Sequence, residues 1–394
     1  MQAVDRNGPR GNRLGTLARS LLAGAGAFAL AGFAAGSASA SETKAFVINW
    51  FYPAIHFSDE ACPGGPAPIS EVFYHRLLKE MGYSPKEIDE QLKGFPNEGK
   101  YRDTTAMRGK DANGNPVNVF AHPETTTDPH MKEAVGKYNL GFNLNGKVEE
   151  NGFTDPETGE QGVDNQFFRV VGCIQSHRAP PGQRPTYLMA IWDILRDQPP
   201  AYLIEVTGID NPMNDDDVEV GIYRALERAN RDSSGDIRGD NTYRVDGDPR
   251  STNHVHGKIK DGVLWTDQAP SIHLVGDPFG LAEYNFQQAR LRLDLKNERA
   301  QKGIIGGYHE WKPIYWHYGS AGWVVEHSSG IEIPGVYYGL KKYADANPDP
   351  KTGENTAISI SYIVETVPAF VVHPENKVSD AGKPGDKQTA QRNN

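Results

Sequence analysis

The sequence lacks the short motifs that mark several enzyme classes. It contains no Gly-x-Ser-x-Gly elbow, no Walker-type phosphate loop and no Cys-x-x-Cys-His segment for covalent haem attachment. His309 and Glu310 are followed by Trp-Lys-Pro, so the second histidine of a zinc-protease helix is missing. No reaction can therefore be assigned from a motif, and function has to be inferred from composition and patterning.

Long apolar runs are also scarce. The most extended one, residues 21–33, is diluted by glycine and is shorter than the roughly 20 residues that cross a bilayer. Arginines precede it and Ala38-Ser39-Ala40 follows it, an arrangement typical of a cleaved export signal. We expect residues 1–40 to be removed, leaving a periplasmic or secreted protein with no membrane span. The alternative is an uncleaved membrane anchor.

Positive charge is in short supply. The chain has 41 Lys and Arg against 51 Asp and Glu, which gives a formal net charge of −10. Removing residues 1–40 takes away four arginines and Asp5, so the net charge becomes −13. Nucleic acids and anionic lipids bind to basic surfaces, and neither is therefore an expected partner.

Only two cysteines, Cys62 and Cys173, are present. In an exported protein a single pair favours a disulfide, because the outer compartments are oxidising. The alternative is a metal site, since His177 stands four residues after Cys173.

Helix signals lie mostly in the first half of the chain and strand signals mostly in the second. Ser84-Pro85-Lys86-Glu87 is a capping box with proline at the first helical position. Alternating apolar and polar residues at 289–296 and 358–364 predict half-buried strands. We expect an α+β fold, with a helical, loop-rich N-terminal part packed on a mainly antiparallel, β-sandwich-like C-terminal part. The expected boundaries are 1–40 for the signal, 41–198 for the helical region, 199–374 for the β-rich region and 375–394 for a disordered tail.

A crowded acidic turn joins two predicted strands at 201–208 and 218–223. Calcium prefers six to eight oxygen ligands, and this turn supplies many. The candidate calcium ligands are Asp210, Asn214, Asp215 and Asp217, with Asn211 and Asp216 beside them. The alternative is ordinary turn chemistry, which also explains the Asp-Pro-x-Thr-Gly runs at 155–159 and 349–353.

Aromatic residues are dense between positions 308 and 323. The candidate ligand-binding residues there are Tyr308, His309, Glu310, Trp311, Trp316, His317 and Trp323. Such density is typical of a surface that stacks sugars or of an apolar ligand pocket, with the charged groups as polar handles. The alternative is a segment whose large rings close the end of a hydrophobic core.

His254 and His256 would project from one face of a strand and could be two metal ligands. Lys258 and Lys260 continue the same face, however, and ammonium groups oppose a bound cation. This face is better interpreted as one in contact with solvent.

Four further segments are the basis of a resemblance: Gly162-Val163-Asp164-Asn165-Gln166, Glu205 to Asp210, Asn214 to Val218 and Gly257 to Leu264. Together they resemble a group of uncharacterised exported bacterial proteins that are rich in β-structure. The resemblance implies a fold and a compartment, and it implies no activity.

These observations lead to two hypotheses for function. The first is a non-catalytic binding or structural protein of the cell envelope, with a small apolar molecule or a carbohydrate as ligand. The alternative is an envelope hydrolase or lyase that uses Glu310 with His309 or His317 as acid and base, since these residue types suit proton transfer.

Overall fold

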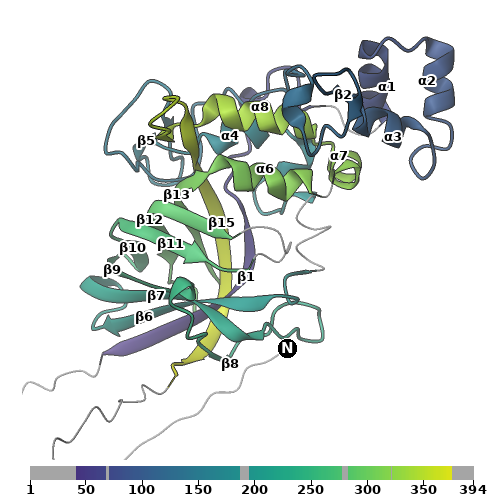
Figure 1. The fold of residues 1–394 in the computed structure, drawn as a ribbon. Helices are drawn as coiled ribbons and strands as arrows, with labels where there is room; N and C mark the ends of the chain where they lie inside the picture. Colours follow the sequence, from purple (N-terminus) through teal and green to yellow (C-terminus); the bar gives the residue numbers. More distant parts are fainter. Residues whose placement is uncertain (1–40, 68–70, 187–194, 277–282, 321, 375–394) are drawn as a thin grey trace, which may run out of the picture. The chain divides into compact units, whose positions relative to one another are not determined.

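The computed structural model describes residues 41–67, 71–186, 195–276, 283–320 and 322–374 (Figure 1). The expected signal at 1–40 and the expected tail at 375–394 lie outside the described residues. Within the described part, no helix is both long enough and apolar enough to cross a membrane.

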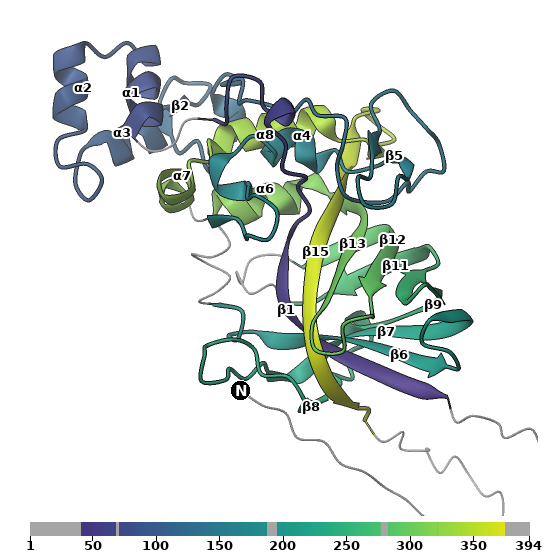
Figure 2. The ribbon, with the colours of Figure 1, turned by 180° about the vertical axis from the view of Figure 1, so that it is seen from behind.

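Antiparallel strands close on themselves to form an eight-stranded barrel (Figures 1 and 2). In their order around the barrel the strands are β1 (Glu42–Pro53), β6 (Pro200–Ile209), β7 (Asn214–Arg228), β9 (Thr252–Lys260), β10 (Val263–Thr266), β12 (Tyr284–Asp294), β13 (Gln301–Glu310) and β15 (Asn355–Val372). The ring closes at β1, which pairs with β6 on one side and with β15 on the other.

The expected α+β fold with a sandwich-like C-terminal part is therefore wrong. The first strand, β1, comes from the region expected to be helical, and its Val47 pairs with Val367 near the end of the described chain. Alternation of apolar and polar residues predicts that a strand has one buried face, but it does not say which strand lies beside it. The closing pair joins distant segments, so no local pattern distinguished a closed barrel from a sandwich.

Cross-strand pairing sorts the side chains of the barrel wall into an inner and an outer face. One inner row runs through residues that are paired in succession and, apart from the glycine, are apolar and buried: Ile259, Leu264, Leu293, Gly303, Val364 and Phe51. The two outer rows beside it are Lys258, Trp265, Arg292, Ile304, Ile363 and Tyr52, and Lys260, Val263, Asp294, Lys302, Glu365 and Trp50. The core therefore fills the barrel, while this part of the outer wall carries mixed charges and rings.

Further strands extend the sheet beyond the barrel. They are β8 (Asn241–Arg244), which pairs parallel to β15, β11 (Ala269–Leu274) beside β12, and β14 (Ala346–Pro348) beside β15. Two short hairpins form from β2 (Gly109–Lys110) with β3 (Pro116–Val117) and from β4 (Phe153–Thr154) with β5 (Gln161–Val163).

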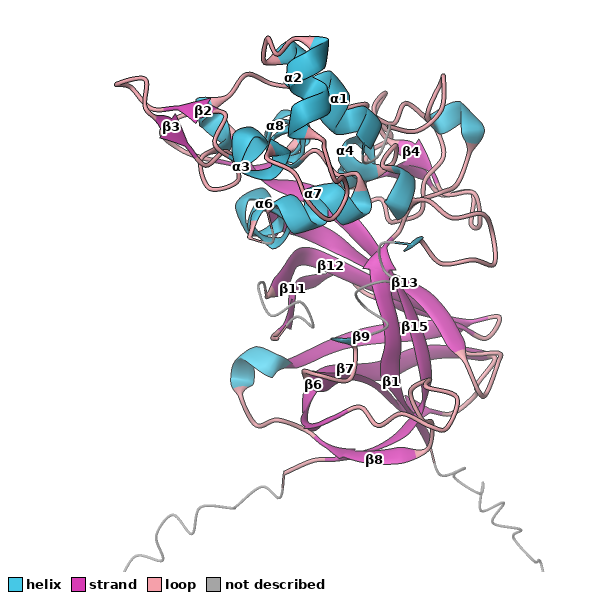
Figure 3. Ribbon diagram, turned by 90° about the vertical axis from the view of Figure 1, so that its right-hand side faces the viewer, coloured by secondary structure: helices cyan, strands magenta, loops and turns pink. Residues whose placement is uncertain are grey.

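Helices cover one end of the barrel (Figures 2 and 3). The described helices are α1 (Glu71–Glu80), α2 (Pro85–Gln91), α3 (Tyr101–Ala106), α4 (Phe167–Val171), α6 (Trp311–Gly319), α7 (Trp323–Ser329) and α8 (Ile333–Tyr343). Helices α4 and α6 each pack against α8, and all three contact β15. The segments that form this cover come from both halves of the chain.

The predicted capping box is confirmed at the start of α2. The Ser84 side chain accepts a hydrogen bond from the Glu87 backbone N–H, and the Glu87 carboxylate accepts one from the Ser84 N–H. The helices α1 to α3 bury a small apolar cluster of their own, formed by Phe73, Tyr74, Leu77, Leu78, Ile88, Leu92 and Tyr101.

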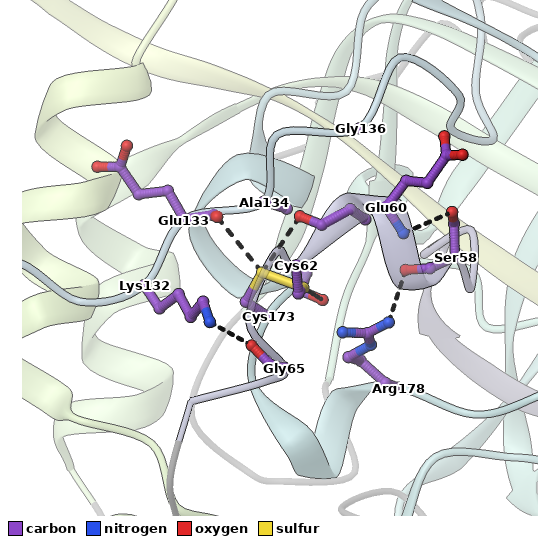
Figure 4. Close-up of a disulfide and its surroundings, with 12 residues drawn as sticks. Ser58, Glu60, Cys62, Gly65, Lys132, Glu133, Ala134, Gly136, Cys173 and Arg178 are labelled. Carbon is purple, nitrogen blue, oxygen red and sulfur yellow. Dashed lines mark hydrogen bonds between the residues drawn. A yellow bond between two sulfur atoms is a disulfide. The ribbon is translucent and has the colours of Figure 1, made fainter.

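Cys62 and Cys173 form the predicted disulfide (Figure 4). Both cysteines are buried in a cluster that includes Ala134 and Phe168. Close by, the Arg178 guanidinium donates to the Ser58 carbonyl at 2.7 Å and the Lys132 ammonium donates to the Gly65 carbonyl. Because both sulfur atoms are in the bond, Cys173 has no thiol to offer a metal together with His177.

Candidate functional site

The aromatic segment at 308–323 mostly closes the core. Tyr308, Trp311, Tyr315 and Tyr318 are buried, and the Trp311 indole N–H donates to the Asn355 carbonyl at 3.2 Å. Trp316, by contrast, is 48% exposed on α6. The backbone of Trp323 begins α7, and its side chain lies outside the described part of the structure. One described tryptophan of the segment is therefore available to a ligand.

The acid and base candidates of this segment, His309, Glu310 and His317, lie in different surroundings. His309 is buried, with Nδ1 2.7 Å from the Glu310 carbonyl oxygen and Nε2 3.2 Å from the Glu283 carbonyl oxygen. Burial lowers the pKa of His309, and both ring nitrogens face main-chain oxygens rather than a substrate. Glu310 has an exposed side chain, and His317 is half-buried against the Tyr318 ring. The acid–base hypothesis stays a prediction with no further geometric support.

The acidic turn between β6 and β7 uses its oxygens to hold the backbone. The Asp215 carboxylate accepts hydrogen bonds from the N–H groups of Asp210, Asn211 and Asp217 at 2.6, 3.1 and 3.2 Å. These backbone hydrogen bonds lower the pKa of Asp215. The Asn214 amide oxygen accepts from Asp261 N–H at 3.2 Å. Across the described residues, no three His, Cys, Asp or Glu side chains are grouped to hold a metal ion.

A different surface is hollowed. The outer rows of β9, β10, β12 and β13 form the floor of adjoining hollows, which we call the outer groove. Its first hollow, of about 870 Å³, is lined by Trp265, Lys258 and Lys260, by the polar side chains of Asn143, Asn145, Thr158, Gln268, Arg290 and Lys296, and by two acidic residues, Asp261 and Asp267. This volume is in the range of small-molecule sites.

The second hollow of the outer groove, of about 360 Å³, shares Thr158, Val263 and Trp265 with the first. Its other lining residues include Arg292, Ile304, Lys302 and Glu157. Two more hollows, of about 310 and 830 Å³, continue from Lys302 toward Tyr52 and Glu365. Trp265 therefore lies where the first two hollows meet, and Lys302 lines the other three.

A loop at residues 140–158 forms one wall of the outer groove, and Arg292 anchors this loop to the barrel. Its guanidinium donates to Asp155 at 3.1 Å and to Glu157 at 2.9 Å. The same guanidinium lies 5.3 Å from the centre of the Trp265 ring, which holds that ring in place. Asp155 also accepts from the N–H groups of Glu157 and Thr158, so the predicted turn chemistry of this run is confirmed.

Three lysines of the outer groove have no acidic partner. Lys258, Lys260 and Lys302 are exposed, and none of them forms an ion pair with a described residue. The acidic neighbours of Lys302 on the adjacent strands are Asp294 and Glu365. Asp294 pairs with Lys296 at 3.2 Å, and Glu365 pairs with Arg184 and accepts from the Tyr52 hydroxyl at 2.7 Å. Both carboxylates are thus already paired.

Two histidines line the third hollow. Burial lowers the pKa of His56, and burial together with the nearby His317 lowers the pKa of His177 to about 3. His177 Nε2 lies 3.0 Å from the Tyr318 hydroxyl oxygen. Both imidazoles are therefore neutral near pH 7, so the positive charges in the outer groove are those of its lysines and arginines.

No sequence pattern predicted the pair of buried carboxyl groups that lies under α1. Glu326 on α7 accepts from the Tyr74 hydroxyl at 3.4 Å, and Glu332 pairs with Arg76 at 2.9 Å. Burial raises the pKa of Glu326 and, despite Arg76, raises that of Glu332 to about 7. Neither carboxyl lines any of the four hollows, so this pair joins α1 to α7 and α8 rather than forming part of the groove.

The outer groove was likewise not predicted. Its signal was present in the solvated face of Lys258 and Lys260 and in the alternation of Val263 and Trp265, but the neighbouring strands were unknown. Comparison with known proteins adds no candidate: no protein-family model, curated protein or solved structure matches the chain.

Proposed function

We propose that the protein is an exported, non-catalytic binding module that holds a carbohydrate along the outer groove. The observation that carries the proposal is the position of Trp265, a half-buried ring where two hollows meet, surrounded by polar side chains. A tryptophan offers an apolar face for a sugar ring, and polar groups around it can bond the hydroxyls.

The polar lining favours a sugar over an apolar molecule. Asn143, Asn145 and Thr158 come from the loop wall, and Gln268 comes from the segment after β10. The Gln268 amide N–H₂ donates to the Leu144 carbonyl at 2.8 Å, which fixes one end of this side chain. Asn143, Asn145 and Thr158 also hydrogen-bond to the main chain, and the donors and acceptors that these side chains have left can bond the hydroxyls of a sugar.

Export is part of the proposal. It is supported by the basic and apolar pattern of residues 1–40, by the small residues at 38–40 and by the resemblance to exported proteins. The Cys62–Cys173 disulfide suits an oxidising compartment.

Two tryptophan variants test where the ligand binds. We expect wild type and Trp316→Ala to be retarded in gels that contain a binding polysaccharide, and Trp265→Ala to migrate as in an empty gel. Trp316→Ala is the matched control, because Trp316 is a described tryptophan of the aromatic segment that is exposed and could itself contact a ligand. Loss of retardation in Trp316→Ala alone would move the site to α6. A wild-type protein that no neutral or acidic polysaccharide retards would refute the proposal.

A further inference from the structure

We infer that the ligand of the outer groove is an acidic oligosaccharide whose negative groups lie against Lys258, Lys260 and Lys302. This inference rests on the proposed function, and it names the chemical class of the ligand. It starts from the three lysines without acidic partners in a protein whose net charge is negative.

The lysines are held in fixed positions by the strand pairing. Lys258 is directly opposite Trp265, and Lys260 is directly opposite Val263, so both ammonium groups extend from the same outer face as the ring. Lys302 lies in the same cross-strand row as Lys260, three strands away through Val263 and Asp294. With strands about 4.8 Å apart, the two lysines are separated by roughly 14 Å along the sheet.

This separation argues for an extended ligand. A single small anion would reach one lysine, whereas a chain lying across β10 and β12 reaches both and passes Trp265 on the way. Lys258 and Lys260 are two positions apart on one strand, which places their Cα atoms about 6.7 Å from each other. The pattern therefore fits a chain that carries separated negative charges on uncharged, hydroxyl-rich units.

The net charge of the protein argues against a densely charged polymer. Surface charges act over about 8–10 Å at physiological salt, so the lysines attract a ligand only when it is in the groove. Beyond the groove the acidic surface repels a polyanion, and a nucleic acid carries a charge on every unit. An acidic sugar chain with fewer charges meets less repulsion.

A matched pair of ligands tests the charge directly. We would titrate wild type with a hyaluronan oligosaccharide of about six units, in which charged and uncharged sugars alternate, and with its methyl ester, which has the same backbone without the charges. We expect the acid to bind about tenfold more tightly than the ester, and we expect this difference to shrink as salt is raised. A sulfated oligosaccharide of equal length distinguishes carboxylate from sulfate as the bound group.

Lysine variants locate the effect. Lys302→Met and the double variant Lys258→Met with Lys260→Met should each weaken binding of the acid by about threefold to tenfold and weaken binding of the ester by clearly less. The control is Lys86→Met, which removes an exposed lysine of α2 outside the barrel and should change neither.

The outcomes separate the two proposals. Equal binding of acid and ester, with no effect of the lysine variants, would overturn the acidic ligand and leave the carbohydrate-binding function standing. Lysine-dependent binding of a single-stranded oligonucleotide as tight as that of the acid would also overturn it, in favour of an unselective polyanion surface. Absence of binding to the acid, the ester and the sulfated chain would overturn the inference, and the carbohydrate-binding function falls with it only if no polysaccharide retards the wild-type protein in the gels.

Discussion

Arg292 and Asp155 form a buried ion pair across 137 positions of sequence, with Nη1 3.1 Å from Oδ2. Arg292 belongs to the outer face of β12, and Asp155 belongs to the loop that walls the outer groove. The pair is thus the physical link between the barrel and the loop. Because the same guanidinium also packs on Trp265, the shape of the groove depends on this one contact.

Breaking this ion pair should destabilise the protein strongly. Arg292→Met leaves the Asp155 carboxylate buried without its partner, a change that typically costs about 3–5 kcal/mol of unfolding free energy. Urea unfolding measures it. The control is Arg250→Met, since Arg250 pairs with Asp248 at 2.9 Å in an exposed position, where an ion pair contributes little to stability. Equal losses in the two variants would contradict the structural role of Arg292.

The disulfide should contribute to stability because it links distant segments. Cys62 and Cys173 are 111 positions apart, and cross-linking a loop of that length stabilises by about 4–5 kcal/mol on the chain-entropy model. We expect reduction, or the double change of both cysteines to serine, to lower the unfolding free energy by about that amount. The melting temperature should fall with it. A melting temperature that reductant leaves unaltered would show that the bond is absent from the protein in solution.

The features that were predicted correctly are those that depend on residues close together in the sequence or on the number of cysteines. The capping box at Ser84, the strands on either side of the acidic turn and the pairing of two buried cysteines all followed from neighbouring residues or simple counting. The barrel did not, because β1 closes it against β15 at the far end of the chain. The groove was not predicted for the same reason. Lys258 and Trp265 lie close in sequence, but Lys302 is brought to the same face only by the pairing of β12 with β10 and β13.

The aromatic segment contains a pair of tryptophans in opposite environments. Trp311→Ala should cost about 3–5 kcal/mol of unfolding free energy, because its ring is buried and its indole N–H is bonded. Trp316→Ala, from the same helix, should cost less than about 1 kcal/mol, since the ring is half in water. Chemical unfolding of the two variants measures the difference. Similar values for both would mean that the two rings are buried to a similar extent in solution, contrary to this packing of α6.

The acidic turn offers a test that separates an ion site from a hydrogen-bonded turn. Asp215→Ala removes the acceptor of three backbone N–H groups, and we expect it to lower the unfolding free energy by about 1–2 kcal/mol. If the oxygens act on the backbone alone, this loss is the same in millimolar calcium and in chelator. A melting temperature that calcium raises in wild type but not in the variant would instead establish the calcium site.

The buried carboxyl Glu332 should make stability depend on pH. Its pKa is raised from 4.5 to about 7 by burial and by the nearby Glu326, against the opposing effect of Arg76 and Arg108. A raised pKa means that the folded state holds the proton more tightly than the unfolded state does. Its contribution is therefore fully present below about pH 4.5 and is lost as pH rises to about 7, a change on the order of 3 kcal/mol.

Glu332→Gln isolates this contribution, because glutamine stays neutral at every pH and can still accept a hydrogen bond from Arg76. The unfolding free energy of wild type relative to Glu332→Gln should fall between about pH 4.5 and pH 7 and then level off. Asp345, whose pKa burial raises to about 6, titrates in both proteins and cancels in the difference. Glu90→Gln, a change at an exposed position of α2, should leave the pH profile of wild type unaltered. A pH-independent difference between wild type and Glu332→Gln would mean that Arg76 keeps this carboxylate ionised throughout, and that the ion pair outweighs its burial.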